Sequence, residues 1–280
     1  MNSAKNKKVV VLSGGVGAAK LLKGLTRVID PTDITAIVNV ADDTQLHGLH
    51  ISPDLDTITY TLAGEIDTQK GWGLQNESWN AMEMLSRYGG VDWFQLGDRD
   101  LGTHMYRTHR IHQGASLSTI AEEIATGLNV KVNLLPASDD PINTIITTPK
   151  AGEIEFQEYF VRYQHNLEIS NVNFKGIKNA QPAPKVIDAI MTASAIIIAP
   201  SNPIVSIGPV LAVPGISEAL DKRRELCVAV SGIINGKALK GPADRMLFDL
   251  GHDVSPLGIA KIYKKVASKI VIDTSDAQYI

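Results

Sequence analysis

The feature of this sequence that most constrains its fold is a β-branched run followed at once by a glycine-rich turn and a helical pattern. Val9–Leu12 has the composition of a buried parallel strand. The turn Ser13-Gly14-Gly15-Val16-Gly17 follows, and a helical pattern continues from Ala18 to Leu25. In such a βα unit the backbone and the helix N-terminus can approach a phosphate group. The sequence therefore predicts an α/β fold with a mainly parallel sheet.

The glycine turn only partly matches known phosphate-binding fingerprints. Gly15-x-Gly17 fits the dinucleotide pattern, but Lys20 stands where the third glycine is expected, and no Gly-Lys-Ser/Thr sequence forms a Walker A loop. A tight turn that binds no ligand is the alternative interpretation. The role of Lys20 is open: it is either a solvated helix residue or a cation that reaches a phosphate. The residues that would contact a phosphate are Gly14, Gly15, Val16, Gly17 and Lys20.

Four carboxylates lie within fifteen residues, after a second apolar run at Ile34–Val38. Ligands of open α/β sheets bind beyond the carboxyl ends of the strands. Acidic side chains at such a position commonly hold a metal ion or accept a proton from an attacking hydroxyl. Asp42 and Asp43 are adjacent, and they repel each other unless a cation or hydrogen-bond donors compensate. A turn in which one of them bonds its own backbone is the alternative.

The other two acids, Asp54 and Asp56, open a predicted helix. Ser52 suits the N-cap, Pro53 the first helical position, and Asp54 the positive end of the helix dipole. Asp54 is thus explained equally well as a helix-start residue and as a ligand. The apolar stripe of this helix consists of Leu55, Ile58 and Leu62. Asp56 therefore points to another side of the helix, which faces the strand-end crevice if the crevice lies on that side.

Polar loops also follow two later apolar runs. Ala195–Ala199 is the strongest predicted buried strand, and the loop Pro200–Pro203 comes directly after it. The prolines of this loop fix its backbone, while Ser201 and Asn202 offer donors for a phosphate or a sugar. A loop at Ser231–Lys240 follows the next strand and carries two lysines.

Aromatic and charged side chains mark the segment between residues 70 and 112. Trp72 lies between two glycines, which suits either a loop that covers a ring or a small hydrophobic anchor. A strand predicted at Trp93–Leu96 leads to Asp98 and Arg99. These two form either a salt-bridged turn or an anion site in which Asp98 orients Arg99. A predicted helix then carries three histidines without a recognisable zinc pattern, and His104 is the one best placed near a site.

The composition is that of an ordinary globular enzyme. The 280 residues are 44% hydrophobic and 20% charged with a net charge of −3, so no basic field attracts nucleic acid. The apolar runs are too short to span a bilayer and no signal peptide is recognised, so we expect a cytoplasmic protein without membrane contact. The single cysteine, Cys227, lies in a strand-like run typical of a buried position.

The order of these patterns predicts a three-layer, Rossmann-like α/β sandwich in which residues 1–280 form a single domain. A small α+β insertion is expected at about residues 140–180. It would contain strands at Asn143–Thr148 and Glu155–Tyr163. Taken together, the strand-end loops indicate a metal-assisted reaction at a phosphorylated, nucleotide-like substrate.

Motifs from residue 13 to residue 246 resemble the 2-phospho-L-lactate transferase (CofD-like) family of coenzyme F-420 biosynthesis, in the order of that family. The combination is specific although each motif alone is not. The motifs are Ser-Gly-Gly-Val-Gly-Ala-Ala-Lys, Asn-Val-Ala-Asp-Asp, His-Gly-Leu-His-Ile-Ser-Pro-Asp-Leu-Asp-Thr, Gly-Trp-Gly, Leu-Gly-Asp-Arg-Asp-Leu, Leu-Pro-Ala-Ser-Asp-Asp-Pro, Ala-Pro-Ser-Asn-Pro-Ile-Val-Ser-Ile-Gly-Pro and Gly-Pro-Ala-Asp-Arg-Met.

The resemblance implies a transferase that joins Fo, a deazaflavin with a ribityl chain, to a guanosine-diphospho-activated lactyl, enolpyruvyl or glyceryl acid. A phosphodiester forms and GMP leaves, with Mg2+ as cofactor. The resemblance implies small-molecule partners and a homodimer. It also implies Mg2+ on Asp42, Asp43 or Asp56, and catalysis by Asp56 with Asp43. The nucleotide would lie on Gly14–Gly17, Lys20, Ser201 and Asn202, and the deazaflavin would lie near Asp56, Asp98, Arg99 and Trp72.

Two other functions fit parts of the sequence. A nucleotide-sugar-binding regulatory protein of the related gluconeogenesis-factor branch shares the glycine turn and an Asp cluster, but not the motifs placed around a deazaflavin. A dinucleotide-dependent oxidoreductase fits less well because the fingerprint is incomplete. One departure from the transferase pattern is Gly232, where a proline is expected after Ser231.

Overall fold

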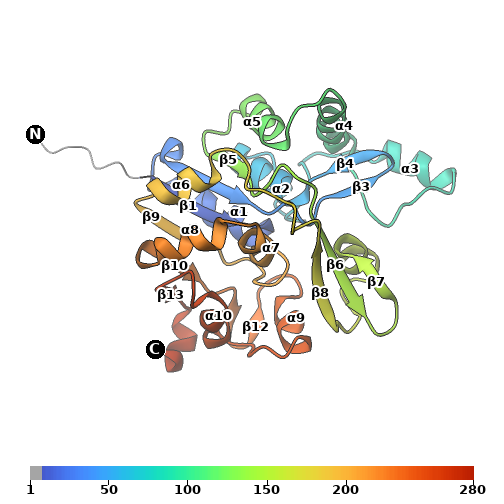
Figure 1. Cartoon of the computed structure of the whole chain (residues 1–280). Coiled ribbons are helices and arrows are strands. Elements are labelled where there is room, and N and C mark those ends of the chain that lie inside the picture. Colours follow the sequence, from blue (N-terminus) through green and yellow to red (C-terminus); the bar gives the residue numbers. More distant parts are fainter. Residues whose placement is uncertain (1–7) are drawn as a thin grey trace, which may run out of the picture.

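A computed structural model describes residues 8–280 (Figure 1). Six parallel strands form the main sheet in the order β13-β10-β9-β1-β2-β5. Their bounds are β1 Val9–Ser13, β2 Ile34–Val38, β5 Asn133–Pro136, β9 Ala195–Ile198, β10 Cys227–Val230 and β13 Lys269–Val271. The predicted α/β class with a mainly parallel sheet is therefore confirmed.

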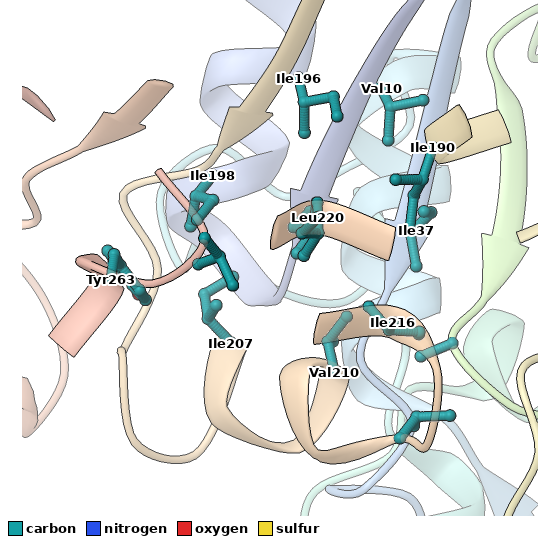
Figure 2. Close-up of a cluster of buried hydrophobic side chains, with 14 of the residues drawn as sticks. Val10, Ile37, Ile190, Ile196, Ile198, Ile207, Val210, Ile216, Leu220 and Tyr263 are labelled. Atoms are coloured by element: carbon teal, nitrogen blue, oxygen red, sulfur yellow. The ribbon is translucent and has the colours of Figure 1, made fainter. Parts of the chain in front are cut away.

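Helices cover both faces of this sheet because its strands alternate their apolar side chains. Val10 and Leu12 of β1 face one apolar cluster, whereas Val9 and Val11 face the other. Figure 2 shows the first cluster, which contains strand side chains such as Ile196 and helix side chains such as Leu220. The helices on this face are α6 Val186–Thr192, α7 Ile207–Ala212, α8 Ile216–Lys222 and α10 Pro256–Tyr263. The other face carries α1 Gly15–Leu25, α2 Pro53–Ala63 and α5 Leu117–Gly127.

The strand order places a topological switch point beside β1. The chain leaves β1 for β2 on one side, and the strand on the other side, β9, comes much later in the sequence. In sheets of this kind, ligands bind beyond the carboxyl ends of the strands at the switch point. The loops that follow β1 and β9 are the glycine turn and Pro200–Pro203. The fold thus brings two of the predicted phosphate-type loops to one edge.

A smaller antiparallel sheet occupies residues 143–175, inside the range predicted for an insertion (Figure 1). Its order is β7-β6-β8, with β6 at Asn143–Thr148, β7 at Gly152–Glu155 and β8 at Asn171–Lys175. The strand predicted at Glu155–Tyr163 is wrong, because Glu158–Arg162 is a π-helix. Tyr159 of this helix is fully buried in a small separate core. The status of the insertion as a subdomain stays a prediction.

The chain between β2 and α2 folds back as a short hairpin that the sequence reading missed. Strands β3 Thr44–Leu46 and β4 Leu49–Ile51 are joined by His47 and Gly48, whose φ angles are 53° and 75°. Two consecutive positive φ angles are characteristic of a type I′ hairpin turn. The hairpin brings residue 52 back beside residue 43.

The remaining elements lie outside the two larger sheets. The strand predicted at Trp93–Leu96 is wrong, since these residues form an irregular loop before α4. None of the helices in residues 8–280 combines the length and the apolar character needed to cross a membrane. The elements not yet given are α3 Asn80–Arg87, α4 Asp98–His112, α9 Ala243–Asp249, β11 Ile233–Ile234 and β12 Lys237–Ala238.

Two glycines of α1 allow a direct test of how the switch-point loops pack. A Cβ atom added to Gly17 would overlap the carbonyl oxygen of Pro200, whereas one added to Gly24 meets no atom within 4 Å. We expect Gly17→Ala to lower the free energy of unfolding by about 1–3 kcal/mol, because backbone must move. The control Gly24→Ala should leave stability unchanged or raise it by up to about 1 kcal/mol. Urea denaturation measures both, and equal stability of the two variants would contradict the packing described.

Candidate active site

Asn39, immediately after β2, gathers two of the carboxylates. Its Nδ2 atom donates to Asp42 Oδ2 at 3.1 Å and to Asp54 Oδ2 at 3.0 Å. Its Oδ1 atom accepts a hydrogen bond from the Ala41 amide at 3.0 Å, which fixes the orientation of the side chain. One buried amide group therefore holds an acid of the strand-end loop against an acid of α2. The motif Asn-Val-Ala-Asp-Asp begins at Asn39, but the sequence predicted no role for this residue.

Asp43, just before β3, is held by two residues on the returning side of the β3–β4 hairpin. Its Oδ2 atom accepts a hydrogen bond from Ser52 Oγ at 2.7 Å and lies 2.9 Å from His50 Nε2. Ser52 occupies the N-cap position of α2, as predicted, but its side chain makes no capping bond. The hydroxyl is used for Asp43 instead. The expected capping contact is therefore wrong, although the expected start of the helix is confirmed.

Asp42, Asp43 and Asp54 form a group that we call the strand-end carboxylates. Burial raises the pKa of Asp42 well above its ordinary value, and the charge of Asp54 adds to this effect. Burial also raises the pKa of Asp54 to about 7, with a further contribution from Asp43. Within residues 8–280, the buried atoms Asp42 Oδ1 and Asp43 Oδ1 have no hydrogen-bond partner. Oxygen atoms in such surroundings fit a hard divalent cation such as Mg2+.

The glycine turn lies directly against Asp54. An added Cβ on Gly14 would lie 3.0 Å from Asp54 Oδ2, and one on Gly15 would lie 3.1 Å from Asp54 Oδ1. Gly15 has a φ of +63°, which a residue with a side chain rarely adopts. The positive end of α1 thus faces a carboxylate of the same chain. Val16 at this turn is half-buried, and Lys20 is exposed on α1.

The loop after β9 is bonded to the glycine turn. Ser201 Oγ donates to the carbonyl oxygen of Gly14 at 2.6 Å, and the serine is buried. Asn202 Oδ1 accepts from the Ile204 amide at 2.9 Å, so its side chain shapes its own loop. These bonds make the two loops one unit. A role for Ser201 and Asn202 in nucleotide binding stays a prediction.

Asp56 belongs to a second buried group, which lies between α2 and α4. Its Oδ1 atom accepts a hydrogen bond from Arg107 Nη2, and its Oδ2 atom lies 3.7 Å from His104 Nδ1. His104 Nε2 lies 3.4 Å from Asp100 Oδ1, which also accepts a hydrogen bond from the Tyr60 hydroxyl at 2.6 Å. We call these five residues the α2–α4 cluster. The sequence singled out Asp56 and His104, and its motifs included Asp100 without a role, whereas Arg107 and Tyr60 were missed.

A signal for the missed residues was present in the spacing of α4. Asp100, His104 and Arg107 are four and three positions apart, which puts them on one face of a helix. One ligand atom from each of Asp56, Asp100 and His104 lies within 4.8 Å of the others, so these residues form a possible metal-binding triad. Burial raises the pKa of Asp56, and the neighbouring Arg107 opposes that shift. Arg107 already compensates the negative charge of Asp56. A bound cation is therefore needed less for charge compensation in this cluster than at the strand-end carboxylates.

Two of the predicted deazaflavin residues, Asp98 and Arg99, lie at the start of α4. The Asp98 carboxylate accepts hydrogen bonds from Ser78 Oγ and from the amides of Asn80 and Ala81, which keeps the pKa of Asp98 low. It therefore caps the start of α3. Arg99 Nη2 lies 3.3 Å from Glu65 Oε2, so the observed ion pair of Arg99 is with a residue outside the Asp98–Arg99 turn. Roles of Asp98 and Arg99 in ligand binding stay predictions.

Trp72 is also accessible to solvent. The residue is 43% exposed, and its ring makes an edge contact with Trp79 at a centroid distance of 6.5 Å. The Lys70 ammonium lies over both rings, 5.4 Å from the Trp72 centroid and 4.3 Å from that of Trp79. The ring can thus meet a ligand, and its role in deazaflavin binding stays a prediction.

The chain is similar to transferases along nearly its whole length. A family model described as 2-phospho-L-lactate transferase CofD matches residues 9–279. A Nocardia farcinica protein named phosphoenolpyruvate transferase is 44% identical over 277 residues, which cover 96% of this chain and 83% of that protein. A Streptomyces griseus protein of the same name is 40% identical over 275 residues, which cover 96% of this chain and 86% of that protein.

Solved structures show a similar fold. Two structures of one Bacillus halodurans protein, described as a member of the UPF0052 family, match with TM-scores of 0.65 and 0.59. Their sequence identities are 23% and 22%; each match covers 98% of this chain and 85% or 90% of the other. At this identity the likeness concerns the fold alone.

The raised pKa of Asp54 predicts how stability depends on pH. Between its ordinary value of 3.8 and about 7, the folded state keeps a proton that the unfolded chain releases. The free energy of unfolding therefore falls as pH rises through this window. In the absence of divalent cations, we expect Asp54→Asn to be more stable than the wild type at pH 8 but not at pH 4. Urea denaturation of both proteins at pH 4 and pH 8 tests this prediction, with Asp188→Asn at an exposed position as the control. An Asp54→Asn variant less stable than the wild type at pH 8 would contradict the prediction.

Proposed function

Because the chain belongs to the 2-phospho-L-lactate transferase CofD family, we propose that it joins the deazaflavin Fo to a guanosine-diphospho-activated three-carbon acid. The family assignment made from the motifs is thereby confirmed, and the chain is a transferase of coenzyme F-420 biosynthesis. The proposed products are a phosphodiester and GMP. The relatives named phosphoenolpyruvate transferase support the enolpyruvyl acid over the lactyl and glyceryl acids.

The observation that carries the proposal is the group of strand-end carboxylates. Phosphoryl transfer depends mostly on positioning and on neutralising charge. Bound Mg2+ would supply that neutralisation on the diphosphate. Asp42 and Asp43, each with a buried oxygen that has no hydrogen bond within residues 8–280, would hold it together with Asp54. Asn39 and His50 would keep these carboxylates oriented.

Asp56 is the proposed acceptor for the attacking hydroxyl. Arg107 occupies its Oδ1 atom, while its buried Oδ2 atom makes no hydrogen bond to any described residue. Burial raises the pKa of Asp56, which makes the carboxylate a better base. In the reaction, the ribityl oxygen would bond to the phosphorus that bears the acid. The bond between that phosphorus and the GMP oxygen would break, and Asp56 would take the hydroxyl proton.

The remaining predicted contacts complete the proposal. The nucleotide would lie near Gly14–Gly17, Lys20 and the loop of Ser201 and Asn202, which lie at the switch point. The deazaflavin would lie near the exposed ring of Trp72, with Asp98 and Arg99 fixing the surrounding loops. Mg2+ as the cofactor and a homodimer are further parts of this proposal.

A discontinuous assay tests the reaction directly. The protein is incubated with Fo, Mg2+ and, separately, the guanosine-diphospho adducts of lactate, phosphoenolpyruvate and 3-phosphoglycerate. We expect mass spectrometry to detect the phosphodiester and an equal amount of GMP with the phosphoenolpyruvate adduct, and none in EDTA. No product with any adduct, from folded protein that still binds nucleotide, would favour a regulatory nucleotide-binding protein instead.

Substitution of Asp56 tests the role of the acceptor. We expect Asp56→Asn to lower turnover by about 10²–10⁴-fold, because the amide cannot take the hydroxyl proton. The control Asp221→Asn, at an exposed position on α8, should keep wild-type turnover. Circular dichroism confirms that both variants are folded. Turnover of Asp56→Asn close to that of the wild type would remove Asp56 from the mechanism.

A further inference from the structure

One guanidinium links the two groups of acids. Arg107 of α4 is 2% exposed, and its Nη2 atom bonds to Asp56 Oδ1. Its Nη1 atom donates to the carbonyl oxygen of His50 at 3.3 Å and lies 3.3 Å from His104 Nδ1. Asp56 and His104 belong to the α2–α4 cluster, and His50 contacts Asp43 of the strand-end carboxylates.

His50 carries this link on to the strand-end carboxylates. Its carbonyl oxygen faces Arg107, and its imidazole Nε2 lies 2.9 Å from Asp43 Oδ2. The residue is the middle one of the three-residue strand β4. Its amide also donates to Thr108 Oγ1 of α4 at 2.8 Å, so its backbone is fixed on both sides. The path from Asp56 to Asp43 thus runs through two side chains and one short strand.

We propose that Arg107 is a positioning residue that holds Asp43 and Asp56 in a fixed relation to each other. The inference rests on the proposed function, in which Asp43 helps to hold the cation and Asp56 accepts the hydroxyl proton. A guanidinium can do this because its donors form a rigid planar fork that serves two acceptors at once. A lysine ammonium is a point charge on a flexible stem and cannot keep both acceptors in the same geometry.

The attachment of α4 to the rest of the protein does not rest on Arg107 alone. Arg110, one turn further along, bonds Glu123 of α5 with an Nη2–Oε1 distance of 2.7 Å. Thr108 accepts the His50 amide independently of the guanidinium. Contacts other than those of Arg107 therefore also dock the helix. Arg110 is also a matched control, since it is an arginine of the same helix paired with a carboxylate.

The test compares Arg107→Lys with Arg110→Lys. Mn2+ affinity, measured by electron paramagnetic resonance without substrate, should fall about 10- to 100-fold in Arg107→Lys, the usual effect of losing support for a metal ligand. The NMR signal of the His50 ring should shift, and kcat should fall while KM for the nucleotide stays unchanged. Arg110→Lys should match the wild type in all of these measurements.

A second pair of variants covers the case in which Arg107→Lys does not fold. His50→Phe keeps a ring of similar size but cannot bond Asp43, so it should lower Mn2+ affinity to a similar extent. His50→Gln presents a nitrogen near the position of Nε2 and should restore much of the affinity. Wild-type affinity in His50→Phe would overturn the proposal.

The outcomes separate this inference from the proposed function. If Arg107→Lys matches Arg110→Lys in Mn2+ affinity and in the His50 signal, the positioning role is overturned, even if turnover falls. If the wild type makes no product with any adduct, the proposed function fails. In that case the Mn2+ and NMR measurements still decide whether Arg107 links the acids.

Discussion

The structure depends on the burial of acidic groups at one edge of a parallel sheet. A carboxylate removed from water is stable only where donors or a cation compensate its charge. Asp42 and Asp54 share one amide of Asn39, Asp43 receives a hydroxyl and an imidazole, and Asp56 receives a guanidinium. The compensation at the strand-end carboxylates is incomplete, as their raised pKa values indicate. That shortfall is the reason why the proposed function puts the cation at this edge of the sheet.

The surrounding fold can be understood as the means of assembling these donors. The main sheet brings the turns after β1, β2 and β9 to one edge. The β3–β4 hairpin returns Ser52 to Asp43, and α4 supplies Arg107 from a distant part of the chain. Glycines at positions 14 and 15 let Asp54 approach the backbone closely. The residues that contact the acids thus come from several layers of the fold.

Local sequence patterns predicted the sheet better than the site. Uninterrupted β-branched runs such as Val9–Leu12 and Ala195–Ala199 are confirmed as strands, because burial on both faces selects such residues. Trp93–Leu96 and Glu155–Tyr163 mix aromatic with polar residues, and they form a loop and a segment with a π-helix, whose aromatic rings pack outside the main sheet. The acids near β2 were recognised, but Asn39 and Arg107 were not. Arg107 lies 51 positions from Asp56, and no local periodicity marks such a pair.

The bond between Ser201 and Gly14 has a consequence for how the protein becomes active during folding. It joins residues 187 positions apart, and β9 pairs with β1 across a similar separation. Contacts of such high sequence separation form slowly, because a long loop must close before they stabilise the chain. A ribosome-bound chain that ends before residue 195 can form β1, β2 and β5 but cannot anchor the glycine turn. The contact between the two switch-point loops therefore forms late, after most of the chain has been synthesised.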